Sequence, residues 1–336
     1  MNQYPRPISI LGAGSWGTAL AMQAARNGCD TLLWGHNPKH IASLKQTGEN
    51  SRYLPGVHFP KNLQFTDNLG EAVAFSSVLL ISVPSHAFRD TMAQIKPMLS
   101  ESSRIAWATK GFDCQDGSLL SEVAAQVLGA NIESAALSGP TFAQEVAADL
   151  PTALTIASTS ESFAAQLSER LHNQRFRIYT SNDIIGVQVG GACKNVLAIA
   201  AGIADGLGFG ANTRAALITR GLTEIMRLGI KLGGHADTFM GLAGLGDLIL
   251  TCTDNQSRNR RFGLALGQGK DQQHALNEIN QEVEGISAAR EAYRLSQKYG
   301  VEMPITEQVY KVLFEHLPPK QAVQNLLTRD QKSENL

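Results

Sequence analysis

Near its start the chain carries the stretch RPISILGAGSWG, residues 6–17. Its apolar part, Ile8 to Leu11, predicts a short buried strand. Gly12, Gly14 and Gly17 fit the pattern G-x-G-x-x-G, in which the first glycine permits a tight turn, the second lets the backbone approach a pyrophosphate, and the third lets helix and strand pack closely. A helix beginning directly after this turn would point its unpaired N–H groups at the phosphates. The stretch therefore predicts a dinucleotide site, with an ordinary strand-to-helix turn as the alternative.

Strands and helices alternate after this turn. Residues 18–26 show helical spacing, and the pair Asn27-Gly28 indicates a helix stop. The continuous apolar run at 77–83 is typical of a strand in a parallel sheet that is covered on both faces. The segment 37–65 is expected to be a long connection without regular secondary structure. The expected strands are 31–34, 77–83, 104–109, 134–137, 152–157 and 175–180, and the expected helices are 67–75, 88–99, 119–128 and 160–172. This order predicts an α/β fold with a Rossmann-type doubly wound sheet.

Strand signals stop after Asp183, and the rest of the chain is predicted to be helical. Asn182 or Asp183 would cap a long helix that runs to about Asp205. Shorter helices are expected at 213–232, 239–246, 259–266, 286–299, 304–314 and 319–327, with a polar tail at 328–336. We therefore expect two domains, a dinucleotide-binding domain at 1–182 and an all-helical substrate-binding and catalytic domain at 183–336.

Bulk composition narrows the class of protein. The 336 residues carry a formal net charge of −1, from 29 basic and 30 acidic side chains, so charge gives no reason to expect nucleic acid as a partner. The four cysteines are scattered, which predicts reduced thiols and no structural zinc. No signal peptide is recognised, and the longest apolar stretch, residues 184–204, is interrupted by Lys194 and several glycines. The expectation is a cytoplasmic protein without metal and without integral membrane association.

The end of the second strand bears on cofactor choice. A site specific for NAD would place a carboxylate there, to bind the ribose 2′-hydroxyl. Asp30 lies before the strand, at its wrong end, whereas His36 lies at the far end, with Lys39 and His40 just beyond. This arrangement tolerates a 2′-phosphate and favours NADPH over NADH, unless His36 is only a surface turn residue.

Several polar residues follow the carboxyl ends of expected strands, the edge where ligands bind in such sheets. They are Ser85, Lys110 and Thr141. A lysine at such a position is often simply solvated. Because Lys110 shares its edge with the glycine turn, we expect it to contact the ligand.

Lys194 lies inside the long predicted helix among small and apolar positions. Gly190, Gly191, Leu197 and Ala198 are its neighbours at helical spacing. Partial burial lowers the pKa of a lysine, which suits it for general acid or base catalysis near neutral pH. The alternative is a lysine whose stem passes a core face and whose ammonium reaches water.

A second polar group follows in the helical half. The run GLAGLGDL at 241–248 presents Asp247 after a series of glycines, and SRN at 257–259 directly precedes a helical pattern. Ser257 or Asn259 would cap that helix, and its N-terminus together with Arg258 would suit a phosphate monoester. A solvated basic turn is the alternative.

These motifs, in this order and spacing, resemble the bacterial NAD(P)-dependent glycerol-3-phosphate dehydrogenases over nearly the whole chain. The matching stretches are GAGSWG at 12–17, VPSH at 83–86, TKG at 109–111, SGPTFA at 138–143, KN at 194–195, GLGD at 244–247, SRN at 257–259 and VEG at 283–285. The resemblance implies a helical half like the C-terminal domain of 6-phosphogluconate dehydrogenase. It also implies reversible conversion of dihydroxyacetone phosphate to sn-glycerol 3-phosphate, with NADPH or NADH as hydride donor, and a product that feeds glycerophospholipid synthesis.

The resemblance also implies roles for individual residues. Lys194 would be the general acid and base, with Lys110 and Asp247 beside the reacting oxygen. The substrate would contact Lys110, Gly139, Thr141, Lys194, Asp247, Ser257, Arg258 and Asn259. The cofactor, NADP or NAD, would contact Gly12, Gly14, Ser15, Trp16, Gly17, His36, Lys110, Ala143, Arg258, Glu282 and Glu284.

Two other functions fit the same plan. One is an oxidoreductase like ketopantoate reductase or 6-phosphogluconate dehydrogenase, which the predicted site at Ser257 and Arg258, suited to a small phosphorylated substrate, disfavours. The other is an NADP sensor without catalytic activity, which the joint presence of Lys110, Lys194 and Asp247 disfavours. A homodimer is expected from the all-helical second half.

Overall fold

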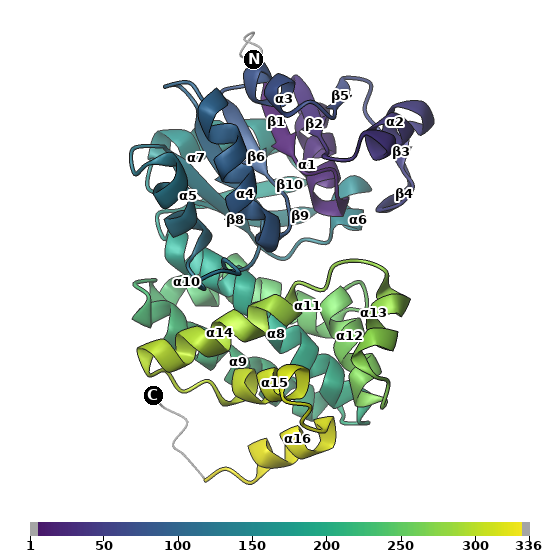
Figure 1. Ribbon diagram of the computed structural model, residues 1–336, viewed down its shortest axis with the longest axis vertical. Helices are drawn as coiled ribbons and strands as arrows, with labels where there is room; N and C mark the ends of the chain where they lie inside the picture. The colour runs from purple at the N-terminus through teal and green to yellow at the C-terminus, as the bar shows by residue number, and fades with distance from the viewer. Residues whose placement is uncertain (1–5, 331–336) are drawn as a thin grey trace.

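The computed structural model describes residues 6–330, which form a sheet lobe and a helical lobe stacked along the long axis of the molecule (Figure 1). The expected polar tail lies outside the described residues from 331 onward. The long sheet lies within residues 8–181, and the elements from Ile184 onward are helical.

The sheet has eight strands in the order β5-β2-β1-β6-β7-β8-β9-β10. Their bounds are β1 Ile8–Leu11, β2 Thr31–Trp34, β5 Leu63–Thr66, β6 Val78–Ile81, β7 Arg104–Trp107, β8 Ser134–Ser138, β9 Thr152–Ser158 and β10 Phe176–Ser181. The six strands from β5 to β8 are parallel and follow the 3-2-1-4-5-6 order of a Rossmann sheet. β9 runs antiparallel to β8, and β10 is parallel to β9. The predicted fold class is confirmed.

Helices cover both faces of this sheet. They are α1 Ser15–Arg26, α2 Pro38–Thr47, α3 Leu69–Phe75, α4 Ser85–Ile95 with the 3₁₀ turn Lys96–Met98, α5 Leu120–Leu128, α6 Ala143–Ala147 and α7 Glu161–Leu171. One apolar cluster joins Ile8 and Ile10 to α1 and α7, and a second joins Leu11 to α3, α4 and α5. Neighbouring residues of β1 thus enter opposite clusters, as the alternation of side chains along a strand requires.

The expectation of irregular structure at 37–65 is wrong. This segment holds α2, the two-stranded sheet of β3 (Glu49–Asn50) and β4 (Leu54–His58), and β5, which pairs in parallel with β2. Asn37 caps α2 by accepting the N–H groups of Lys39 and His40. The short strands are partly exposed, so they lack the continuous apolar run that marks a buried strand.

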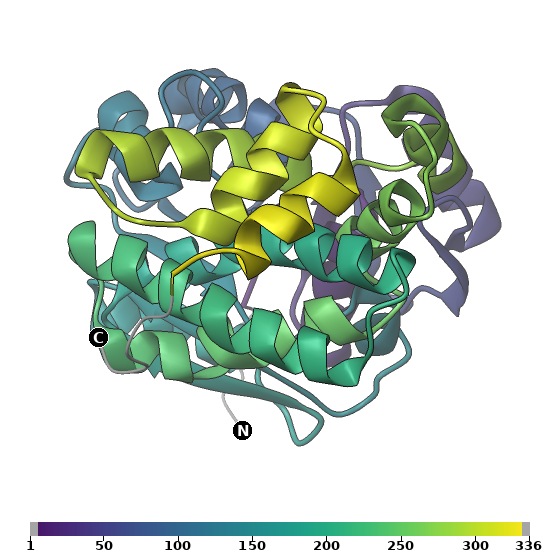
Figure 2. The ribbon, with the colours of Figure 1, turned by 90° about the horizontal axis from the view of Figure 1, so that it is seen from below.

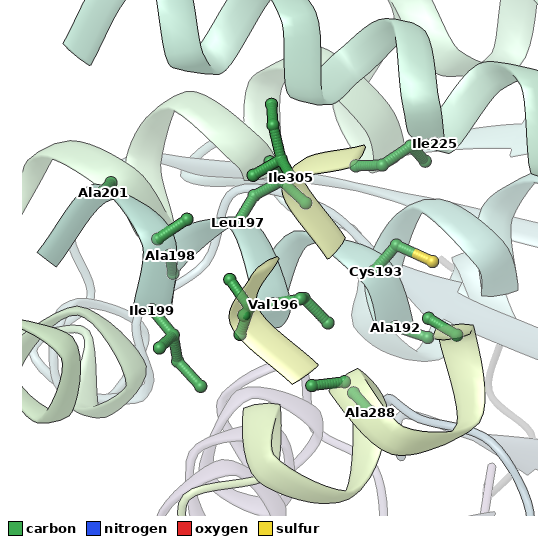
Figure 3. Close-up of a cluster of buried hydrophobic side chains, with 14 of the residues drawn as sticks. Ala192, Cys193, Val196, Leu197, Ala198, Ile199, Ala201, Ile225, Ala288 and Ile305 are labelled. Atoms are coloured by element: carbon green, nitrogen blue, oxygen red, sulfur yellow. The ribbon is translucent and has the colours of Figure 1, made fainter. Parts of the chain in front are cut away.

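The helical lobe is built around α8, Ile184–Gly206 (Figures 1 and 2). The others are α9 Ala211–Lys231, α10 Ala236–Met240, the π-helical turn η2 Leu242–Gly246, α11 Asp247–Thr253, α12 Arg258–Gly267, α13 Gln272–Ile279, α14 Gly285–Tyr299, α15 Pro304–Phe314 and α16 Pro319–Leu327. Figure 3 shows side chains of α8 surrounded by Ile225 of α9, Ala288 of α14 and Ile305 of α15. Within the described residues α8 is the one helix long and apolar enough to cross a membrane, yet 94% of its most apolar window is buried in the molecule.

Three helix predictions need correction. α4 begins at Ser85, earlier than expected, and α13 was not anticipated. The helix expected at 239–246 is instead α10, η2 and a further helix, α11, that begins at Asp247. At Gly244 an added Cβ would lie 2.1 Å from the carbonyl oxygen of Phe239, so the chain doubles back closely there. Glycines that end a helix and glycines that allow such contact look alike in sequence.

Candidate active site

The glycine turn joins β1 to α1 as the motif predicts. Gly12 has a φ of +126°, and an added Cβ there would lie 2.5 Å from the carbonyl oxygen of Ser82. An added Cβ at Gly17 would lie 1.9 Å from the carbonyl oxygen of Gly12, so helix and turn touch through backbone. An added Cβ at Gly14 would meet nothing within 4 Å. The space that a pyrophosphate needs is therefore open at Gly14, at the N-terminus of α1.

Ser15 and Trp16 begin α1 at this open turn. The indole of Trp16 packs against the cluster under α1. Its buried Nε1 has no hydrogen-bond partner within residues 6–330. A buried donor without a partner is costly, and this one lies in the first turn of the helix that the cofactor motif builds. The donors open to a dinucleotide at this turn are instead the first N–H groups of α1, which no side chain caps.

The carboxyl end of β2 presents His36 to solvent. Lys39 is exposed in the first turn of α2, whereas His40 is partly buried and lies 3.2 Å from Oδ1 of Asn50 through its Nε2. His40 also packs edge-on against Tyr53. Of the three basic residues considered from the sequence, His36 and Lys39 are the ones whose side chains are exposed at this end of the strand.

The long helix α8 brings Lys194 to the edge of the sheet. Asp183 caps the helix by accepting the N–H of Gly186 at 2.7 Å, as expected. An added Cβ at Gly190 would lie 2.5 Å from the carbonyl oxygen of Ala243, and one at Gly191 would lie 2.7 Å from Oγ of Ser138. These two glycines let the helix lie directly against η2 and the end of β8, so Lys194 is buried at the junction of the lobes.

Lys110, Asp247 and Lys194 form one charged cluster. The Asp247 carboxylate is fully buried, with Lys194 Nζ donating to its Oδ1 and Lys110 Nζ donating to its Oδ2 at 2.7 Å. Lys110 Nζ also donates to the carbonyl oxygen of Gly139 at 3.3 Å, and Ser138 Oγ lies 3.4 Å from Asp247 Oδ2. Three residues that are far apart in the sequence therefore meet at the carboxyl edge of the sheet.

The environment of Lys194 lowers its pKa well below the ordinary value. Burial is the main cause, and the positive charge of Lys110 adds to it, while the Asp247 carboxylate opposes both. One carboxylate here serves two ammonium groups, so it does not compensate fully for the loss of water around Lys194. The lowered pKa is the property expected of a lysine that exchanges protons near neutral pH.

Sequence reasoning did not identify Thr251. Its Oγ1 accepts a hydrogen bond from Lys194 Nζ at 2.9 Å and donates to the backbone carbonyl of Asp247 at 2.6 Å. The available signal was spacing, because residues four apart on a helix lie on the same face. That signal needs α11, which the sequence did not predict.

The opposite end of the site is the N-terminus of α12. Ser257 caps it by accepting the N–H of Arg260 at 3.2 Å, and Arg258 is the first helical residue. Asn259 points inward: its Nδ2 donates to Asn195 Oδ1, and its Oδ1 accepts the N–H of Gly285, each at 2.9 Å. Asn259 therefore ties α12 to α8 and α14, which leaves only part of its amide for a ligand.

Glu284 lies just before α14 and faces the same region. Burial raises the pKa of its carboxyl, while Arg258, Lys110 and Lys194 act on it in the opposite direction. The neighbouring Glu282 carboxylate adds to the effect of burial. Glu282 lies farther out, exposed, 3.9 Å from Nδ1 of His86 across the two lobes.

The remaining predicted residues lie on the sheet side of the site. Gly139 has a φ of +158° and follows β8, and Thr141 Oγ1 donates to its carbonyl oxygen at 3.2 Å. Ala143 begins α6, the short helix beside α1, and packs against the sheet cluster. Ser85 is buried in the first turn of α4. An added Cβ at Gly111 would lie 2.9 Å from Ser85 Oγ, so this hydroxyl lies beside the residue that follows Lys110.

Comparison with known proteins gives consistent results over both lobes. The family models described as NAD-dependent glycerol-3-phosphate dehydrogenase N-terminus and C-terminus match residues 7–164 and 183–324. A relative from Aeromonas hydrophila, named NAD(P)+ glycerol-3-phosphate dehydrogenase, is 59% identical over 97% of this chain and 98% of its own length. One from Colwellia psychrerythraea with the same name is 58% identical, with the same coverage.

Comparison with solved structures leads to the same family. The crystal structure of glycerol-3-phosphate dehydrogenase from Coxiella burnetii has a TM-score of 0.94 and 51% identity, and the match covers 97% of this chain and 99% of that one. A ketopantoate reductase from Ralstonia eutropha has a TM-score of 0.59 at 16% identity, covering 94% of this chain and 99% of that one. At this low identity, the similarity to the ketopantoate reductase shows a shared fold and nothing about activity.

Proposed function

This chain belongs to the family of NAD-dependent glycerol-3-phosphate dehydrogenases, and we propose that it reversibly reduces dihydroxyacetone phosphate to sn-glycerol 3-phosphate with NADPH or NADH. The observation that carries the proposal is the buried cluster of Lys110, Asp247 and Lys194 at the carboxyl edge of the sheet. In a doubly wound sheet the cofactor lies along that edge. A proton donor beside the reactive end of a nicotinamide is what reduction of a ketone requires.

The residues of the glycine turn would hold the cofactor. Gly12, Gly14 and Gly17 leave room for its pyrophosphate, and the first N–H groups of α1, at Ser15 and Trp16, would bind it. When bound, the cofactor supplies the hydride. His36 would contact the adenosine ribose, which favours NADPH, with NADH also used. Ala143, Arg258, Glu282 and Glu284 would border the rest of the cofactor.

Lys194 would act as the general acid in reduction and the general base in oxidation. Its ammonium would give a proton to the oxygen on C2 of the substrate, while Asp247 and Thr251 hold its Nζ in place. Lys110 would add a second positive charge next to the oxygen as its negative charge develops. In the reverse direction neutral Lys194 would take the hydroxyl proton, which its lowered pKa permits.

The phosphate of the substrate would lie at the N-terminus of α12. Ser257 and Asn259 would offer hydrogen bonds there, and Arg258 would offer a charged fork. Gly139 and Thr141 would contact the substrate from the sheet side. Binding energy from the phosphate, remote from the reacting carbon, would align C2 with the proton donor.

We further propose the wider setting that the resemblance implies. The two domains would divide at 182/183, and the product would supply glycerophospholipid synthesis. The enzyme would be cytoplasmic, consistent with cysteines that are unpaired throughout residues 6–330. Its partners would be this small-molecule substrate and a second copy in a homodimer.

Absorbance at the nicotinamide band tests the proposal directly. Purified protein is mixed with dihydroxyacetone phosphate and either NADPH or NADH, with ketopantoate assayed in parallel. 6-Phosphogluconate, an alcohol that would be oxidised, is assayed separately with NADP+ or NAD+. Rapid oxidation with dihydroxyacetone phosphate alone is expected, faster with NADPH. Turnover of another substrate would indicate a different dehydrogenase, and cofactor binding without turnover of any would indicate a sensor.

A further inference from the structure

The guanidinium of Arg260 joins three separate segments of the helical lobe. Its Nε donates to the carbonyl oxygen of Cys252 at 3.1 Å, one terminal nitrogen donates to Asn255 Oδ1, and the other pairs with Asp205 Oδ2 at 2.5 Å. Arg260 is only 7% exposed. Its acceptors belong to the end of α11, to the turn before α12, and to the end of α8.

These three segments are the ones that carry the helical lobe's part of the site. Lys194 lies about three helical turns before Asp205 on α8. Thr251, which contacts Lys194, directly precedes Cys252. Asn255 lies in the turn that leads to Ser257 and its helix cap. A single buried side chain therefore connects the proton donor, its carboxylate partner and the proposed phosphate site.

Helix packing alone does not fix the turn at 254–257. α8 and α12 are in backbone contact, since an added Cβ at Gly202 would lie 2.1 Å from the carbonyl oxygen of Arg260. That contact places α12 but does not reach the turn. The turn is held by the bonds from Ser257 N–H to the Asp254 carbonyl at 3.2 Å and from Gln256 N–H to Asp254 Oδ1 at 2.7 Å, by the exposed bond from Gln256 to Glu145, and by Arg260.

Only an arginine suits this position. Three acceptors in different directions match the rigid fork of donors of a guanidinium, whereas a lysine ammonium cannot reach all three from one nitrogen. Asp205 is also paired with Arg214 of α9 at 3.1 Å. Within residues 6–330 Arg214 pairs with Asp205 and has no hydrogen bond to α11 or to the turn, so it interacts with Asp205 without joining these segments.

We propose that Arg260, anchored by Asp205, is a positioning residue that aligns the phosphate-binding turn at Ser257 and Arg258 with Lys194. This inference rests on the proposed function, because it assumes that the substrate phosphate binds at that turn. Loss of the link would displace the phosphate relative to the proton donor. The effect would then be confined to substrates that carry a phosphate.

The test compares Arg260→Lys and Asp205→Asn with the matched control Arg214→Gln. For each, kcat and KM are measured with dihydroxyacetone phosphate, and kcat/KM with dihydroxyacetone, which lacks the phosphate. We expect Arg260→Lys to lower kcat/KM for the phosphorylated substrate roughly 10- to 100-fold, the scale of a misplacement of about 1 Å, mainly through KM. Activity on dihydroxyacetone, and both activities of Arg214→Gln, should remain at the wild-type level.

Two results would overturn the positioning role. One is an equal loss of activity on both substrates, and the other is an unchanged KM for dihydroxyacetone phosphate in both Arg260→Lys and Asp205→Asn. If Arg260→Lys fails to fold, Asp205→Asn, which keeps an acceptor oxygen, decides the question by the same criterion. A wild-type enzyme without activity on dihydroxyacetone phosphate would instead overturn the proposed function, and this inference with it. An active wild type with unaffected variants would overturn the positioning role alone.

Discussion

At the scale of single residues, the site depends on one carboxylate placed between two lysines. Asp247 is fully buried, and each of its oxygens accepts from a different ammonium group. A buried charge is costly without a partner, so Asp247 and Lys194 each favour the charged form of the other. The surplus positive charge is what a developing alkoxide would neutralise.

Replacing Lys194 tests the proton transfer. We expect Lys194→Ala to lower kcat by roughly 10²–10⁴-fold, because the variant lacks the general acid. Steady-state kinetics with dihydroxyacetone phosphate measure the loss, and an unchanged Kd for NADPH shows that the fold and cofactor site persist. A variant that keeps more than about a third of the wild-type kcat would exclude this role, since general acid catalysis contributes at least ~10²-fold.

Replacing Arg258 tests the phosphate contact. Arg258→Ala removes the charged fork at the N-terminus of α12, and we expect it mainly to raise KM for dihydroxyacetone phosphate. A rise of roughly 10-fold or more corresponds to the loss of a charge-assisted hydrogen bond of about 1.5–3 kcal/mol. Initial rates over a range of substrate concentrations give the answer. An unchanged KM would place the phosphate elsewhere.

At the scale of elements, the turn between β1 and α1 gives its glycines different tasks. Gly17 is where backbone touches backbone, and Gly14 is where the surface is open. The N-terminus of α1 is capped by Gly14 without any side-chain hydrogen bond. Its N–H groups are therefore available to an anion.

Two alanine substitutions separate these tasks. Gly17→Ala would bring its Cβ to 1.9 Å from the Gly12 carbonyl oxygen, so we expect a clear loss of thermal stability along with loss of cofactor binding. Gly14→Ala meets no protein atom within 4 Å and should leave Tm nearly unchanged while weakening NADPH binding. Thermal unfolding and fluorescence titration measure the pair. Normal NADPH affinity in Gly14→Ala would argue against pyrophosphate at this turn.

At the scale of the whole molecule, side chains of the two lobes meet in contacts away from the charged cluster. His86 approaches Glu282, and Gln256 donates to Glu145 at 2.9 Å, so each lobe contributes a side chain to both contacts. Within the helical lobe, buried Glu224 joins α9 to the start of α15 by accepting the N–H groups of Ile305 and Thr306. Burial raises the pKa of Glu224 from 4.5 to about 7.

This raised pKa makes stability depend on pH. Between about pH 4.5 and 7 the folded protein binds a proton at Glu224 that the unfolded chain releases, so stability falls as pH rises through this window. In the wild type the free energy of unfolding should differ by at most about 3 kcal/mol between the two ends of this window. Glu224→Gln does not titrate and should lose this dependence on pH. Denaturant unfolding at several pH values measures it in both proteins. Parallel pH profiles for wild type and variant would contradict the raised pKa.

The sequence by itself predicted those features that depend on residues close together in the chain. The glycine turn and the apolar strands were predicted from residues close in sequence, and the structure confirms them. For two helix caps the sequence left a pair of candidates each, of which the structure shows Asp183 and Ser257. The charged residues of the site were recognised by type and by their place at strand ends and helix faces. The family followed from the spacing of those motifs.

Only the tertiary structure showed those features that depend on contacts between residues far apart in the sequence. The segment at 37–65 becomes ordered because β5 gains its hydrogen bonds from β2, and no local apolar run announces that pairing. The same holds for α11, which places Thr251 against Lys194, and for Arg260, whose three acceptors come from separate segments. A lysine's pKa depends on burial and on which charges lie beside it. The sequence therefore named Lys194 and Asp247, whereas packing between the lobes put one carboxylate between two ammonium groups.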